Sequence, residues 1–137
     1  MPKQFCNHYH GMHETDSCDA GVEFSTLEHY GTAKFRKSCP CFGPEQTGKC
    51  QHKAYPTAEE MAEREAERKR SFEDTMKARA AIVDSLGGPW ERGMEGSTGD
   101  IDCPVCGVAG ALQFSRSGYN GHIHASCRTS GCVGWME

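Results

Sequence analysis

Residues 57–87 carry the clearest pattern of polar and apolar positions in the chain. Ala, Glu, Arg, Lys and Met dominate this stretch, and Gly87-Gly88-Pro89 follows it. In Pro56-Thr57-Ala58-Glu59-Glu60, the Thr57 hydroxyl and the Glu60 carboxylate can each accept a bond from the other residue's backbone N–H, which is typical of a helix start. Gly supplies a left-handed cap at the other end, and Pro cannot continue a helix. The pattern predicts one long, charged central helix.

Large apolar residues are concentrated in the second half of this helix. Before Ser71 the only one is Met61, so the first half is expected to be solvated. Further on, apolar residues recur at every third or fourth position and share one helix face; they are Phe72, Met76, Ala80, Val83 and Leu86, with Ile82 beside them. This stripe predicts contact with a zinc module or, alternatively, dimerisation with the same helix of a second chain. Residues 88–100 are rich in Gly and are predicted to be a flexible linker, with Trp90 as a candidate anchor.

Residues 101–137 alternate like short strands between two cysteine pairs. Ala111 to Arg116 and His122 to Ser126 each alternate, and Asn120-Gly121 between them is a strong hairpin signal. Val133-Gly134-Trp135 can add a third short strand. Two cysteine pairs flanking such a hairpin form the two knuckles of a zinc ribbon. The predicted ligands are Cys103, Cys106, Cys127 and Cys132.

Composition explains why a metal is expected at both ends of the chain. The hydrophobic content is 36 %, the mean hydropathy is −0.67, and nine residues are Cys. Very small domains that cannot bury enough apolar surface usually need metals or disulfides. Nine is an odd number, the first ten residues lack an apolar signal segment, and no stretch approaches the ~18 apolar residues of a membrane span. We therefore expect reduced thiols that bind Zn²⁺ in a cytoplasmic protein without membrane association.

Residues 1–56 hold five Cys and five His, and several ligand sets are compatible with them. The preferred prediction is one four-thiolate zinc site, because Gly follows soon after two of the cysteines and the other two bring the ends of the segment together. Its ligands are Cys6, Cys18, Cys41 and Cys50. In a second set, His8 or His52 replaces one thiolate, and a third is a local site of Cys39, Cys41, Cys50 and His52. His10 and His13 are further candidates. Each set gives one ion here and two Zn²⁺ per chain.

The elements combine into a small metal-stabilised α+β fold. It comprises an N-terminal Cys/His-rich zinc module over residues 1–56, the central helix over 57–87, the linker over 88–100 and the zinc ribbon over 101–137. Motifs of zinc deaminases, zinc proteases, phosphate-binding loops and serine hydrolases do not occur in the sequence. Because both zinc modules offer at least four ligands, neither keeps the open position of a catalytic zinc, and no enzymatic activity is expected.

Motifs at both ends of the chain resemble small phage-encoded proteins of uncharacterised function. The N-terminal motifs are Cys6-Asn7-His8-Tyr9-His10-Gly11, Cys18-Asp19-Ala20-Gly21-Val22, Pro40-Cys41-Phe42, Cys50 and Pro56-Thr57-Ala58-Glu59-Glu60. The tail is the more specific part, with Tyr119-Asn120-Gly121-His122-Ile123-His124-Ala125, Cys127, Cys132 and Trp135-Met136-Glu137. The resemblance implies a phage or prophage origin and a role in the bacterial host cytoplasm. The ribbon alone also resembles those of topoisomerases, primases and transcription factors.

Two functional hypotheses follow. The first is a protein-binding adaptor, or an inhibitor of a host factor, that docks on a host or phage protein; the net charge of −4 favours it over a broad nucleic-acid surface. The second is a nucleic-acid-binding module that works through the ribbon, with stacking aromatics and phosphate-binding arginines. Its candidate residues are Arg116, Tyr119, Arg128 and Trp135. In the competing interpretation, Phe114 and Trp135 form the small core of the ribbon itself.

Overall fold

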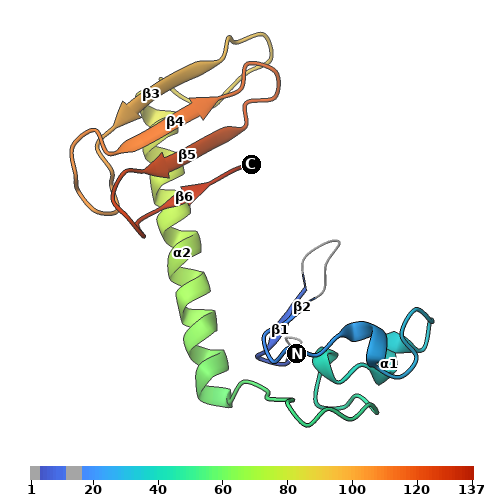
Figure 1. Ribbon diagram of the computed structural model, residues 1–137. Helices are drawn as coiled ribbons and strands as arrows, with labels where there is room; N and C mark the ends of the chain where they lie inside the picture. Colours follow the sequence, from blue (N-terminus) through green and yellow to red (C-terminus); the bar gives the residue numbers. More distant parts are fainter. Residues whose placement is uncertain (1–3, 12–16) are drawn as a thin grey trace. The chain divides into compact units, whose positions relative to one another are not determined.

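The computed structural model describes residues 4–11 and 17–137, which fall into two compact units divided between Arg64 and Glu65 (Figure 1). The structure has the predicted α+β character, with one long helix and an antiparallel sheet. The helices are the 3-10 turn Phe24–Thr26, α1 (Phe35–Ser38), the 3-10 turn Pro40–Phe42 and α2 (Ala58–Ser85). The strands are β1 (Tyr9–His10), β2 (Ser17–Cys18), β3 (Ser97–Ile101), β4 (Leu112–Arg116), β5 (Ile123–Cys127) and β6 (Gly134–Trp135). None of the described helices combines the length and the apolar character that a membrane crossing requires.

Both predicted ends of helix α2 are confirmed by their hydrogen bonds. The Thr57 N–H donates to the Glu60 carboxylate at 2.7 Å, and the Glu60 N–H donates to the Thr57 hydroxyl at 3.2 Å. At the other end, Gly87 has φ 82°, and the Gly88 N–H donates to the Val83 carbonyl at 3.0 Å. This closing bond is the Schellman motif, which satisfies carbonyls left free at a helix end.

The buried face of α2 agrees with the predicted stripe only near the end of the helix, where Ile82, Val83 and Leu86 pack in or against the core. Ala78 and Ile82 are fully buried, whereas Phe72 is 65 % and Met76 is 47 % exposed. The prediction gave weight to large side chains, but the helix lies on the sheet through Ala78, because a small side chain lets the helix approach closely. Val83 and Leu86 of the predicted stripe do pack against the core, from its border.

The four-stranded antiparallel sheet of the second unit has the order β3-β4-β5-β6, and α2 lies against one of its faces (Figure 1). Strand β4 buries every second residue, and β5 does the same with Ile123 and Ala125. The predicted hairpin is confirmed, with Phe114 opposite Ala125, and β6 supplies the predicted third strand. The core joins the sheet to the helix through Ala78, Ile82, Cys103, Ala111, Leu112, Phe114, Ile123 and Ala125.

The predicted flexible linker is wrong over its last residues, because residues 97–101 form strand β3 at the edge of the sheet. Gly99 pairs with Phe114, and a side chain at Gly99 would lie 3.1 Å from the Phe114 ring. A side chain at this strand position would crowd the ring, so only Gly fits there without displacing it. Upstream, Trp90 is half-buried against the backbone of Gly121, as expected of an anchor.

The first unit is built from short elements around thiols and aromatic rings. Strands β1 and β2 form a two-residue antiparallel pair, with Tyr9 opposite Cys18. The buried cluster consists of Cys6, Phe24, Cys39 and Cys41, with Tyr9, Cys18, Leu27, Phe35, Phe42 and Tyr55 packed around it. Rings of Tyr9 and Phe42 meet edge to face at 5.5 Å. Three of the four buried members are cysteines, so little ordinary apolar core is present in this cluster.

Candidate metal centre

The first cysteine turn, residues 103–108, is a tight turn that follows strand β3 in the chain. The Gly107 N–H donates to the Cys103 carbonyl at 2.7 Å, and the Cys103 N–H donates to the Val108 carbonyl at 3.0 Å. Gly107 has φ 76°, a left-handed conformation that Gly adopts at little cost. The turn holds Cys103 in the core at 1 % exposure and leaves Cys106 exposed.

The second cysteine turn, residues 127–133, connects β5 to β6. The Cys127 N–H donates to the Val133 carbonyl at 2.8 Å, and the Cys132 N–H donates to the Thr129 carbonyl at 3.2 Å. Gly131, at φ 70°, permits the bend between the two cysteines. The Arg128 N–H donates to the Ala111 carbonyl at 2.8 Å, which fixes the second turn beside strand β4.

The four sulfur atoms of these turns converge on one point. The Cys103 Sγ lies 3.7 Å from the Cys132 Sγ, and the Cys106 Sγ lies 3.7 Å from the Cys127 Sγ. All four sulfurs are within 4.8 Å of one another. A tetrahedral ion with metal–sulfur bonds of about 2.3 Å has sulfur–sulfur edges of about 3.8 Å. The cluster therefore has the size that a four-thiolate metal centre requires, and all four predicted C-terminal ligands are brought together.

Protonation differs sharply between two of these thiols. A hydrogen bond from the Thr129 hydroxyl, and then one from the Val108 N–H, lowers the pKa of Cys106 to about 6. Burial, and then the neighbouring thiol of Cys103, raises the pKa of Cys132 to about 12. A bound cation would have to displace the remaining protons, since thiolates are the ligand form. Thr129, two residues after Cys127, was not recognised from the sequence as part of this site.

The predicted N-terminal cysteines surround a second, smaller space. Cys6, Cys18, Cys41 and Cys50 all line one cavity of about 10 Å³, which is close to the volume of a single water-sized sphere. The two histidines that could replace a thiolate, His8 and His52, line it as well. However, the C-terminal four are the only group of three or more ligand atoms within 4.8 Å of one another among residues 4–11 and 17–137. The structure thus gathers the predicted ligands of the first unit without bringing them to metal-binding distance.

Other candidates of the first unit have identifiable surroundings. Cys39 is 1 % exposed, and its side chain is hydrogen-bonded to Cys41, whose pKa is raised to about 12 by burial first and by Cys39 second. The Cys6 sulfur accepts a bond from the Ala54 N–H at 3.4 Å, as metal-binding thiolates often do. His10 instead pairs with the Asp19 carboxylate at 2.7 Å. His13 lies outside the described residues.

The four predicted nucleic-acid contacts differ in exposure. Arg116 is only 6 % exposed and donates to the Gly88 carbonyl at 3.2 Å, so the prediction that it binds phosphate is wrong. The reason is its register, because Arg116 continues the inward alternation of Leu112 and Phe114. Trp135 is half-buried and packs against the core. Tyr119, at 92 % exposure, and Arg128, whose side chain is 61 % exposed, remain accessible.

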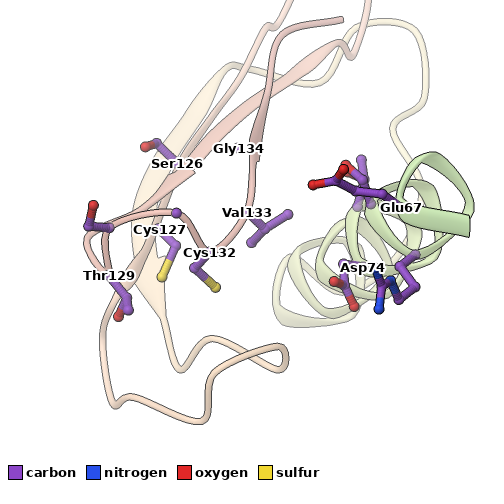
Figure 2. A pocket seen from close by; sticks show the side chains of 13 residues that line it. Glu67, Asp74, Ser126, Cys127, Thr129, Cys132, Val133 and Gly134 are labelled. Atoms are coloured by element: carbon purple, nitrogen blue, oxygen red, sulfur yellow. The ribbon is translucent and has the colours of Figure 1, made fainter. Parts of the chain in front are cut away.

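A groove of about 620 Å³ lies between helix α2 and the second cysteine turn (Figure 2). We call it the α2 groove. Its helical wall consists of Glu67, Arg70, Ser71, Asp74 and Thr75, and its opposite wall of Ser126, Cys127 and residues 129–134. Two of the four clustered cysteines, Cys127 and Cys132, therefore lie along this groove.

Comparison of the chain with protein-family models, curated proteins and solved structures found no match.

Proposed function

We propose that this protein is a non-enzymatic, zinc-stabilised interaction protein that docks on a host or phage protein as an adaptor or inhibitor. The observation that carries the proposal is the closed four-sulfur cluster of the second unit. Its four sulfurs lie within 4.8 Å of one another, and four thiolates would fill every ligand position of a tetrahedral zinc ion. A catalytic zinc needs a corner for water or substrate, so a closed site serves the fold rather than a reaction.

Zinc is the metal that this donor set favours. Four thiolates in tetrahedral geometry select zinc or an iron–sulfur centre, and in structural sites Cys₄ is a common zinc ligand set. We propose that the two cysteine turns and the hairpin between them form a zinc ribbon. Iron–thiolate centres absorb visible light and zinc does not, so the spectrum of the pure protein distinguishes the two.

A second Zn²⁺ in the first unit is also part of the proposal. The preferred ligands remain Cys6, Cys18, Cys41 and Cys50, because four separate segments bring these thiols around one cavity. A core made largely of cysteines has little hydrophobic stabilisation of its own, and a structural ion would supply it. His8 and His52 line the same cavity and remain the alternatives to one thiolate.

Protein binding is favoured over nucleic-acid binding because two of the four predicted nucleic-acid contacts lie in or against the core. Arg116 and Trp135 contribute to the interior of the second unit, which leaves Tyr119 and Arg128 of the original four. Of the two predicted phosphate-binding arginines only Arg128 stays exposed, and it lies 3.9 Å from the Asp100 carboxylate in a chain of net charge −4, which gives little phosphate attraction. The exposed Tyr119 and Arg128 motivate the nucleic-acid alternative, which the same experiment tests.

The test uses the full zinc-loaded chain as bait in a bacterial lysate, with and without nuclease treatment. The expected result is a specific protein partner that survives nuclease treatment and binds again when both proteins are pure. Double substitution of Tyr119 and Arg128 by Ala should leave this binding unchanged. Recovery of nucleic acid alone, lost in that double variant, would instead establish the alternative and refute the adaptor.

A further inference from the structure

The α2 groove is lined mostly by polar side chains and by exposed backbone. Val133 is the large apolar side chain among its lining residues, and Figure 2 shows it extending toward the helix. The remaining lining consists of charged groups, hydroxyls, cysteines and the backbone of two glycines. A purely hydrophobic ligand would leave these polar groups without partners, which is costly. The lining therefore suits a ligand with its own regularly spaced donors and acceptors, such as a peptide backbone.

The helical wall is acidic in balance. Glu67 and Asp74 are seven residues apart and share one face of α2, and Figure 2 shows both on the side facing the second cysteine turn. Arg70 is the single cation of the lining. None of these three residues belongs to an ion pair found in the described part of the chain. Two unpaired carboxylates against one guanidinium disfavour a phosphodiester strand and favour a ligand with Lys or Arg.

The opposite wall ends at a free sheet edge. Strand β6 is the last strand in the order β3-β4-β5-β6, so it pairs only with β5. Gly134, the first residue of β6, and Val133 just before it line the α2 groove. An unpaired strand edge presents backbone N–H and C=O groups that an extended peptide can pair with. At Gly134 no side chain stands in the way of such a peptide.

We propose that the α2 groove binds an extended, Lys- or Arg-containing segment of a partner protein, added to the sheet beside β6. This inference rests on the proposed adaptor function and specifies where the partner binds and with what chemistry. Main-chain hydrogen bonds to β6 supply affinity, and the carboxylates of Glu67 and Asp74 select basic side chains. The volume of the groove, about 620 Å³, is in the usual range for ligand sites.

The test is NMR titration of the ¹⁵N-labelled, zinc-loaded full chain with three defined peptides. The first is acetyl-(Lys-Val)₃-amide, the second is the matching Glu-Val peptide, and the third is the Lys-Val peptide N-methylated at alternate residues. Only the first should shift the amide signals of residues 67–75 and 129–135. Absence of these shifts, or equal binding of the Glu-Val peptide, overturns the proposal. Equal binding of the N-methylated peptide overturns strand addition.

Matched variants separate the groove from general charge effects. The double variant E67K/D74K should weaken binding of the Lys-Val peptide roughly tenfold or more, since two ion pairs become repulsive contacts. The control is E73K, which changes an exposed carboxylate of the same helix outside the α2 groove. This control should bind within about twofold of the parent chain, because only long-range charge changes. An equal loss in both variants would refute the assignment to the groove.

The two proposals fail in different ways. If a partner found by affinity capture still binds E67K/D74K as tightly as the parent chain, the α2 groove is not its site and the adaptor function stands. If the pure protein binds no protein partner, the adaptor function fails even where the Lys-Val peptide shifts the groove signals.

Discussion

Truncating Ile82 tests whether the second half of α2 is part of the core of the sheet unit. Ile82 is fully buried in the cluster that also contains Leu112, Phe114 and Ile123. Replacing a buried Ile by Ala costs about 2–5 kcal/mol, from lost burial and from the cavity left behind. We expect I82A to lose about 3 kcal/mol. With a urea dependence of about 1.5 kcal/mol per molar, the unfolding midpoint would fall by about 2 M.

The assay is urea unfolding followed by tryptophan fluorescence in excess Zn²⁺. The chain has two tryptophans, Trp90 and Trp135, and both lie in residues 65–137, so the signal reports on this unit. The control is F72A, because Phe72 belongs to the predicted apolar stripe but is 65 % exposed. F72A should change stability by less than about 0.5 kcal/mol, helped by the higher helix propensity of Ala. A cost in F72A equal to that in I82A would refute the observed helix orientation.

Three further predictions concern strand β3, the side-chain carboxylate of Glu137 and the first cysteine turn. Valine at Gly99 should push the Phe114 ring aside and cost about 1–2 kcal/mol by urea unfolding, whereas valine at exposed Thr98 should not. Partial burial alone would raise the pKa of Glu137, but the Arg79 guanidinium and the Ile123 N–H lower it below its usual 4.5. E137Q should therefore cost about 1 kcal/mol at pH 7, and this difference should vanish as the pH falls through the lowered pKa; a constant difference would contradict the ionic origin. C103S should abolish zinc binding by the second unit and lower its unfolding midpoint, and an unchanged zinc content would contradict the ligand assignment.

The features that the sequence predicted correctly are those with local causes. The capping box of Thr57 and Glu60 acts across three residues, and the turn at Gly107 acts within one cysteine pair. Such interactions depend on spacing that is visible in the sequence. The same holds for the hairpin of β4 and β5, whose alternation and Asn-Gly turn identify it.

The features that it missed depend on contacts between distant segments. The sequence of strand β3 predicts a linker, because Gly99 lowers strand propensity. Gly suits this position only because it pairs with Phe114, whose ring leaves no room for a side chain. The buried helix face was predicted only in part, because Ala78 contributes little to an apolar pattern and matters through its close approach to the sheet. Arg116 could have been placed correctly, since the alternation of Leu112 and Phe114 already assigns it to the inner face.

The N-terminal ligand set also depends on contacts between distant segments, which the sequence does not show. The cysteines of the first unit come from segments far apart in the chain, so their spacing does not identify a set. The fold adds that Cys6, Cys18, Cys41 and Cys50 line one cavity together with His8 and His52, but it does not choose between these ligands, because they are not at metal-binding distance. Cys39, which the preferred ligand set leaves out, is the most buried of the five and is hydrogen-bonded to Cys41.

We propose that metal–thiolate bonds stabilise both units, in the first because its buried cluster is mostly cysteine and in the second in addition to the apolar core. Native mass spectrometry of the purified full chain measures this directly. The account predicts the added mass of two Zn²⁺ per chain, falling to one in C103S and to one in C6S. A chain that is folded with all nine thiols free and carries no metal mass would contradict it.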